Sequence, residues 1–164
     1  MFSSDLIAAA AALVVDFSAK GLKLATAESC TGGLIAGLLT EVPGSSVVVE
    51  RGFVTYSNEA KAQMLGIDPV LIKQHGAVSE AVARAMAAGA LSRAPVNVAV
   101  AVTGVAGPGG GSIEKPVGLV HFAAGSRDGV MIHREIRFGD IGRSTVRLAT
   151  IREALALLRQ AAKL

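Results

Sequence analysis

The 164-residue chain has no tryptophan, one tyrosine and one cysteine, Cys30. A single cysteine forms no internal disulfide, which fits a reducing compartment such as the cytoplasm. The chain also lacks a block of lysines and arginines, and its net charge is only +3. Because nucleic-acid-binding proteins carry basic patches, often interleaved with aromatic residues, we expect no nucleic-acid partner.

Long apolar runs are missing as well. The apolar run near the start covers residues 6–15, lies between Asp5 and Asp16, and has no lysine or arginine before it. A secretory signal carries positive charge ahead of its apolar segment, and a membrane span needs about 20 apolar residues. We therefore interpret this run as an amphipathic or buried first helix, and we expect a cytoplasmic protein with no membrane partner.

What the chain does have is small aliphatic side chains. It is 51% hydrophobic and 18% charged, with 19 glycines. This composition is typical of a globular protein, and the length suits a single domain over residues 1–164. The apolar composition also favours self-association, so we expect a homo-oligomer, a dimer or higher.

Helical and strand patterns alternate along the chain and end in a hairpin. The alternation and the late hairpin predict an α/β fold, a three-layer α/β/α sandwich with a mixed β-sheet. A bulge is expected at Gly52. The expected helices cover residues 4–20, 31–42, 58–65, 68–75, 80–94 and 148–163, and the expected strands cover residues 22–26, 47–57, 96–106, 117–125 and 129–138.

A glycine-rich segment, "TGVAGPGGGS" (103–112), follows the most apolar strand. Ligands in α/β folds bind at the carboxyl ends of such strands, and glycines let the backbone approach them closely. The segment matches neither the P-loop nor the dinucleotide-binding pattern. It is either a ligand-binding loop or a flexible connection.

Two candidate nucleophiles, Ser29 and Cys30, stand where the first strand gives way to a helix. Backbone amides at a helix start have no intrahelical acceptor, so a nucleophile there would have an oxyanion site beside it. The alternative is structural: Ser29 or Thr31 caps the helix, and Cys30 is a small core residue.

A hydroxyl nucleophile needs a base. None of the three histidines, His75, His121 and His133, has a neighbouring acid in the sequence that suggests a triad, so we interpret them as structural. Lys61 is the better candidate, since it is one turn into a helix that follows a strand. Buried there, a lysine loses its charge readily and acts as a base. The alternative is a solvated surface lysine.

Four motifs occur together: "TAESCTGG", "ERGFVTYSNEAKAQMLG", "HGAVSEAVA" and "VTGVAGPGGGSIEKPVG". In this order they resemble the CinA C-terminal domain family, from about residue 5 to residue 160. Members of this length are similar to stand-alone nicotinamide-nucleotide amidohydrolases. The resemblance implies hydrolysis of the carboxamide of nicotinamide mononucleotide (NMN) to nicotinate mononucleotide and ammonia, in pyridine-nucleotide salvage, without a metal or another cofactor.

The resemblance also implies roles for individual residues. Ser29 would be the nucleophile and Lys61 the base, with Tyr56 close to both. The family tends to show Gly-Asp-Arg followed by Val-Arg, whereas "FGDIGRSTVR" places two residues between Asp140 and the first arginine, which leaves the role of Asp140 open. The implied substrate-binding residues are Thr31, Gly32, Gly33, Thr103, Gly104, Gly107, Gly109, Arg143 and Arg147, the two arginines as candidates for the phosphate.

Two other functions remain open at this point. The domain can be a non-catalytic module that binds pyridine nucleotides and is linked to competence or DNA damage, although such a copy would be expected to lose Ser29 or Lys61. A thiol amidase built on Cys30 is the other alternative, and the lack of a recognisable histidine partner speaks against it.

Overall fold

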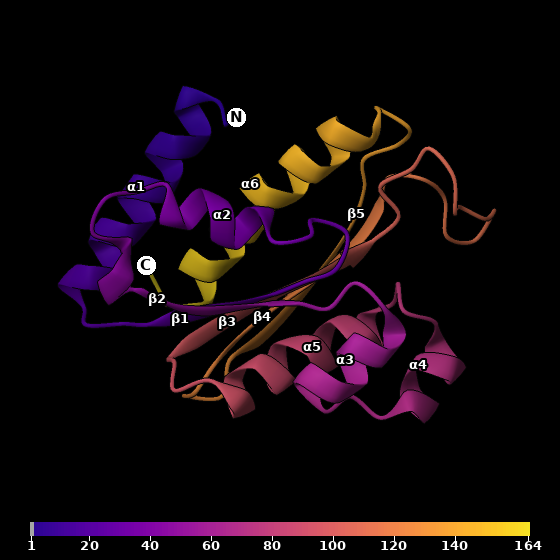
Figure 1. The fold of residues 1–164 in the computed structure, drawn as a ribbon, viewed down its shortest axis with the longest axis horizontal. Coiled ribbons are helices and arrows are strands. Elements are labelled where there is room, and N and C mark those ends of the chain that lie inside the picture. Colours follow the sequence, from indigo (N-terminus) through magenta and orange to yellow (C-terminus); the bar gives the residue numbers. More distant parts are fainter. Residues whose placement is uncertain (1) are drawn as a thin grey trace.

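The computed structural model describes residues 2–164, which fold around one five-stranded sheet (Figure 1). In chain order the elements are α1 (Ser4–Ala19), β1 (Leu24–Glu28), α2 (Leu34–Thr40), the 3-10 helix η1 (Ser45–Val47), β2 (Val49–Val54), α3 (Asn58–Leu65), α4 (Pro69–His75), α5 (Glu80–Arg93), β3 (Val98–Gly104), β4 (Leu119–Ser126), β5 (Met131–Arg137) and α6 (Arg143–Ala161).

The sheet is mixed, with strand order β2-β1-β3-β4-β5. β1 lies between β2 and β3 and runs parallel to both. β4 is antiparallel to β3 and to β5. Because β1, β2 and β3 are parallel, their carboxyl ends meet at one edge of the sheet, where the connecting segments gather.

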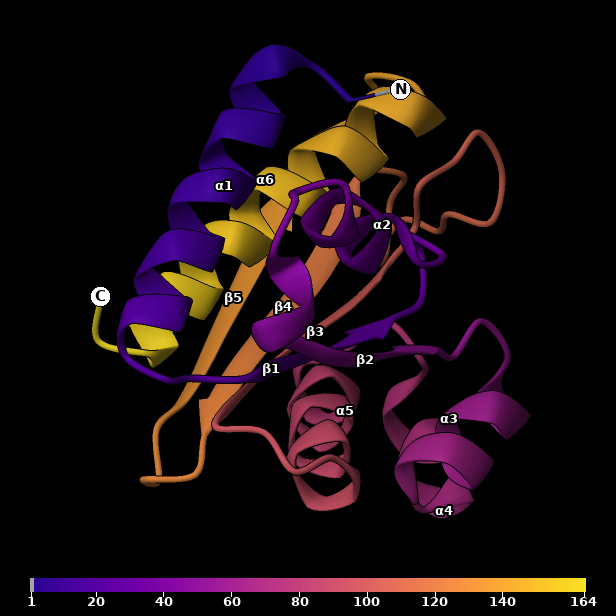
Figure 2. The same cartoon turned by 60° about the vertical axis from the view of Figure 1, so that its left-hand side comes forward.

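Helices cover both faces of the sheet (Figures 1 and 2). α1, α2 and α6 lie on one face, and α5 lies on the other with α3 and α4 beside it. Each face of the sheet carries a hydrophobic core, and β3 is buried in both. Its valines, such as Val100, belong to the core under α1, α2 and α6, and its alanines, such as Ala99, belong to the core under α5. The predicted α/β/α sandwich is confirmed.

Three helices begin where the sequence predicts. Ser57 accepts a hydrogen bond from the N–H of Ala60 at 3.0 Å at the start of α3. Asp68 caps α4 in the same way, and Ser79 caps α5. Short polar side chains satisfy amides that the first helical turn leaves unpaired, so these starts are visible in the sequence.

Three details of the prediction are wrong. α2 begins at Leu34, because the preceding residues 31–33 form a turn. α6 begins at Arg143, five residues before the expected start. The sequence did not reveal this start, because Gly142 gives no side-chain cap and the first turn is polar. The irregularity in β2 lies between Val49 and Arg51 rather than at Gly52.

No helix within residues 2–164 combines the length and the apolar character that crossing a bilayer requires.

Candidate active site

Ser29 and Lys61 meet at the carboxyl edge of the sheet. Ser29 directly follows β1, and Lys61 lies in the first turn of α3, after β2. Lys61 Nζ lies 3.0 Å from Ser29 Oγ and donates a second hydrogen bond, of 2.9 Å, to the carbonyl of Thr55. The Lys61 residue is only 1% exposed, so it is not a solvated surface lysine.

Burial makes the Lys61 amine a usable base. Desolvation lowers the pKa of Lys61 below its ordinary value, and the smaller influence of Cys30 opposes this. Among residues 2–164 no carboxylate forms an ion pair with Lys61. A neutral amine at this position offers its lone pair to the Ser29 hydroxyl proton, which is what a serine nucleophile requires.

Burial moves the pKa of Cys30 in the opposite direction, because here the deprotonated form is the charged one. Burial raises the pKa of its thiol to about 12, so the thiolate is scarce near neutral pH. The side chain packs in the core beneath α2. Cys30 is therefore the small core residue of the structural interpretation, while Ser29 is no helix cap, because its hydroxyl is bonded to Lys61.

The buried carboxylate of Glu28 organises the turn that carries Ser29. It accepts hydrogen bonds of 2.7 to 3.0 Å from two hydroxyls and three backbone amides, those of Thr26, Thr31, Gly33, Ile35 and Ala36. The expectation that the amides at the start of α2 are free is therefore wrong, because Glu28 uses them. The unpaired amides lie earlier, at Cys30 and Thr31.

Glu28→Gln should destabilise the protein by about 2–4 kcal/mol. The glutamine NH2 group would replace one carboxylate oxygen, so the N–H and O–H groups that this oxygen accepts would lose their acceptor. Urea unfolding measures the change. Glu41→Gln is the matched control, since Glu41 lies exposed at the other end of α2. A loss below about 1 kcal/mol for Glu28→Gln would show that the carboxylate does not hold this turn.

A cavity of about 210 Å³ opens beside Ser29 and Lys61. It is small compared with the roughly 300–1,000 Å³ of typical ligand sites, so it suits one ring and leaves the rest of a ligand at its mouth. The remaining lining residues are Cys30, Tyr56, Asn58, Ala77, Val78, Thr103, Gly104, Ala106 and Arg143.

Arg143 lies at the mouth of this cavity. Its guanidinium donates to the carbonyl of Gly107 at 3.0 Å and to the hydroxyl of Tyr56 at 3.1 Å. It has no carboxylate partner among the described residues. Tyr56 is 62% exposed and lines the cavity, but its hydroxyl is bonded to Arg143 rather than to Ser29 or Lys61.

The other predicted substrate-binding residues fall into two groups. Thr103 and Gly104 line the cavity, and the Thr103 hydroxyl donates to the carbonyl of Ala77 at 2.8 Å. Gly107 contributes the carbonyl that holds Arg143. The structure does not bring the remaining predicted residues into the cavity lining: Thr31, Gly32, Gly33, Gly109 and Arg147.

Sequence reasoning missed several cavity residues. The carbonyl of Thr55 holds Lys61, and Asn58, Ala77 and Val78 complete the wall. A backbone carbonyl leaves no signal in a sequence. Asn58 was detectable, since it is a polar residue in the same helical turn as Lys61.

Two of the histidines lie in a polar group on the sheet, away from Ser29 and Lys61. Carboxylates do lie near two histidines: His133 is 3.5 Å from Glu80 and His121 is 3.8 Å from Glu135. The two rings also face each other, with His121 Nδ1 3.0 Å from His133 Nε2. The acids come from other elements and so were invisible in the local sequence. This group contains no serine or cysteine nucleophile.

No group of three or more histidine, cysteine, aspartate or glutamate side chains within residues 2–164 is arranged to hold a metal ion.

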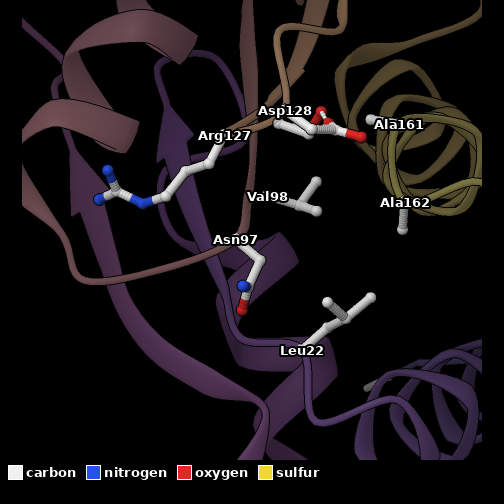
Figure 3. A pocket seen from close by; sticks show the side chains of 8 residues that line it. Leu22, Asn97, Val98, Arg127, Asp128, Ala161 and Ala162 are labelled. Carbon is white, nitrogen blue, oxygen red and sulfur yellow. Dashed lines mark hydrogen bonds between the residues drawn. The ribbon is translucent and has the colours of Figure 1, made fainter.

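A second cavity, of about 260 Å³, lies at the opposite end of the sheet (Figure 3). Its lining is half apolar, from residues such as Leu22, Val98 and Ala162, and half polar, from residues such as Asn97 and Asp128. Arg127 points away from it, because its guanidinium binds backbone carbonyls at the end of α5 and before β3. Ser126 and Asp128 also border it, and the Ser126 hydroxyl donates a hydrogen bond to the Asp128 carboxylate, whose second oxygen accepts from Lys163 at the exposed surface.

The chain is similar to proteins of one family. The family model for the CinA C-terminal domain matches residues 7–162. A CinA-like protein of Mycobacterium marinum is 55% identical over 139 residues, which are 85% of this chain and 32% of that protein. A putative competence-damage inducible protein of Caldicellulosiruptor bescii is 52% identical over 142 residues, 86% of this chain and 34% of that protein.

Solved structures agree with this relationship. The competence/damage inducible protein CihA of Agrobacterium tumefaciens is 56% identical with a TM-score of 0.97, covering 99% of this chain and 98% of that one. A CinA superfamily protein of Escherichia coli is 35% identical with a TM-score of 0.89, covering 98% and 93%. The chain spans about a third of the length of the curated relatives named above. The chain belongs to the CinA C-terminal domain family.

Proposed function

We propose that the protein hydrolyses the carboxamide of NMN, giving nicotinate mononucleotide and ammonia, with Ser29 as nucleophile and Lys61 as base. The observation that carries the proposal is the 3.0 Å contact between Lys61 Nζ and Ser29 Oγ inside a cavity. A buried lysine without a carboxylate partner is costly to keep charged, so its place beside a serine hydroxyl supports a catalytic role.

The chemistry follows from this contact. Neutral Lys61 accepts the hydroxyl proton as Ser29 Oγ attacks the carboxamide carbon. The C–N bond then breaks, and Lys61 returns the proton to the leaving nitrogen, which departs as ammonia. Water next attacks the ester on Ser29 and gives one proton to Lys61. The nicotinate mononucleotide leaves, and Lys61 restores the Ser29 hydroxyl.

The small volume of the cavity favours one orientation of NMN. Its small volume suits the pyridinium ring, whose carboxamide would lie against Ser29. The ribose phosphate would then extend to the mouth, where Arg143 lies without a carboxylate partner. The ring's positive charge also disfavours a protonated Lys61 nearby, which keeps the base neutral.

The test is product formation by the purified protein. With NMN it should release ammonia and nicotinate mononucleotide in equal amounts. Nicotinamide and nicotinamide riboside should react poorly, because both lack the phosphate. NAD is the fourth compound, and it tests whether a second nucleotide attached to the phosphate of NMN is accepted. Turnover of the riboside as efficient as that of NMN would contradict a phosphate-directed site.

Arg143→Ala should raise KM for NMN roughly 10- to 100-fold and change kcat less, because a phosphate contact is similar in the ground and transition states. The preference for NMN over nicotinamide riboside should shrink by a similar factor. Steady-state kinetics on both substrates measures this. If the variant still rejects the riboside as strongly as the wild type, Arg143 is not the phosphate anchor.

The alternative function is a non-catalytic module that binds pyridine nucleotides. Relatives such as the Caldicellulosiruptor bescii and Agrobacterium tumefaciens proteins are named for competence and damage induction, which is a reason to retain this alternative. The intact Ser29–Lys61 contact favours the enzyme, because binding alone needs no buried base beside a hydroxyl. Binding of NMN without ammonia release would favour the module.

A further inference from the structure

Arg147 does not face the Ser29 cavity. Its Nε donates to the carbonyl of Cys30 at 3.2 Å, and its NH2 group donates to the carbonyl of Thr31 at 2.9 Å. The side chain borders a different hollow, of about 180 Å³, lined also by Phe2, Leu34, Ser144 and Leu148. α2 and α6 lie together on one face of the sheet (Figure 2). The two hydrogen bonds place the Arg147 side chain against the turn that follows Ser29.

These two contacts fix the direction of a neighbouring amide. In a trans peptide the C=O and the N–H point in opposite directions. Because Arg147 holds the carbonyl of Cys30, the N–H of Thr31 in the same peptide must point away from Arg147. The preceding peptide is held as well, since the carbonyl of Ser29 accepts the N–H of Gly32 at 3.1 Å and so sets the direction of the Cys30 N–H.

Both amides are left without a partner in the described structure. No backbone or side-chain oxygen of residues 2–164 accepts the N–H of Cys30 or of Thr31, although both residues are buried. The amides of α2 itself are bonded to Glu28 and are not available. Buried donors are nearly always paired, so two adjacent unpaired amides immediately after a nucleophile indicate an acceptor that arrives with the substrate.

We propose that Arg147 is a positioning residue that holds the turn after Ser29, through the carbonyls of Cys30 and Thr31, so that the N–H of Cys30, a residue that lines the cavity, binds the oxyanion formed when Ser29 attacks. This inference rests on the proposed amidase function. Ser29 attack converts the carboxamide C=O into a C–O⁻ group, and Lys61 takes the hydroxyl proton. A preoriented amide donor stabilises that charge more than it stabilises the neutral carbonyl.

This role differs in its kinetic signature from a phosphate contact. A positioning residue for the oxyanion acts on the transition state, so its loss lowers kcat and leaves substrate binding unchanged. A phosphate anchor would raise KM and the dissociation constant. Arg147 was predicted together with Arg143 as a candidate for the phosphate. Its hydrogen bonds to the carbonyls of Cys30 and Thr31 give it a different role from Arg143, which lies at the cavity.

Arg147→Ala should lower kcat for NMN roughly 10- to 100-fold, less than or equal to the loss from deleting one oxyanion donor. Arg147→Lys should restore part of the rate, since an ammonium reaches one carbonyl. In a Ser29→Ala background, Arg147→Ala should leave the dissociation constant of NMN within about twofold. A higher KM with unchanged kcat would overturn the proposal and return Arg147 to the phosphate.

An aldehyde analogue tests the oxyanion directly. The NMN analogue with an aldehyde in place of the carboxamide adds Ser29 Oγ to its carbonyl carbon, and the carbonyl oxygen then occupies the oxyanion position. Its inhibition constant should rise in Arg147→Ala by the factor lost from kcat. An unchanged inhibition constant would overturn the proposal. Arg152→Ala is the control on the same helix, because Arg152 is exposed and its ion pair within residues 2–164 is with Asp5.

A second substrate separates this inference from the proposed function. The activated ester p-nitrophenyl acetate acylates an accessible, activated serine without requiring NMN recognition. If the wild type releases no ammonia from NMN, the NMN function fails, and slower ester acylation in Arg147→Ala still supports the positioning role. Equal acylation rates in the wild type and Arg147→Ala overturn it. If neither compound reacts with the wild type, both proposals fail.

Discussion

Ser29→Ala is expected to lower kcat for NMN hydrolysis by roughly 10⁴- to 10⁶-fold, the size of effect seen when a serine nucleophile is removed. The loss follows because no other described nucleophile shares a hydrogen bond with Lys61. The fold should remain intact, since within residues 2–164 the Ser29 hydroxyl makes one hydrogen bond, to Lys61. Ammonia release by the purified variant measures the effect, and thermal unfolding checks the fold.

Cys30→Ala is the matched control for Ser29→Ala. The thiol is held protonated by burial, so its loss should leave most of the turnover and cost only packing in the core. An inactive Cys30→Ala together with an active Ser29→Ala would reverse the assignment and favour a thiol amidase.

Lys61→Arg is expected to lower kcat/KM roughly 10²- to 10⁴-fold, the usual contribution of a general base. Arginine keeps the positive charge but does not release its proton at working pH, so it cannot accept the Ser29 proton. Lys61→Met removes both charge and base and should lose a similar factor. NMN titrations of both variants should show largely preserved binding. Substantial turnover by Lys61→Arg would contradict the lysine-base mechanism.

The pH dependence of stability gives an independent check on Lys61. Burial lowers its pKa in the folded state, so the unfolded state binds more protons between that lowered pKa and the ordinary lysine pKa of 10.5. This group's contribution to stability therefore rises with pH through that window. Lys61→Met should remove this rise and increase the melting temperature at neutral pH. A lower melting temperature would show that Lys61 does not carry a burial penalty.

Much of the fold could be predicted from local sequence. The valine and alanine alternation of β3 predicts a strand buried on both faces, and Ser57, Asp68 and Ser79 mark helix starts through their capping side chains. The start of α6 could not be read this way, because its first turn is polar and follows Gly142. Tertiary packing fixes that boundary.

The site was predictable in its chemistry and less so in its geometry. Ser29 and Lys61 stood out because each follows a strand of the same sheet. Their 3.0 Å contact depends on β1 and β2 being adjacent and parallel, which no local pattern encodes. The hydrogen bonds from α2 amides to Glu28 and the bond from Arg147 to the Cys30 carbonyl could not be predicted for the same reason, since both depend on contacts between separate elements.

The central claim is that the buried Ser29–Lys61 pair hydrolyses the NMN carboxamide. The most direct measurement is kcat/KM for ammonia release from NMN as a function of pH, for the wild type and Ser29→Ala in parallel. The wild-type rate should rise with pH as Lys61 loses its proton and then level off, with nicotinate mononucleotide formed in equal amount, and Ser29→Ala should stay near the uncatalysed rate. NMN binding by the wild type with no ammonia at any pH would contradict the claim.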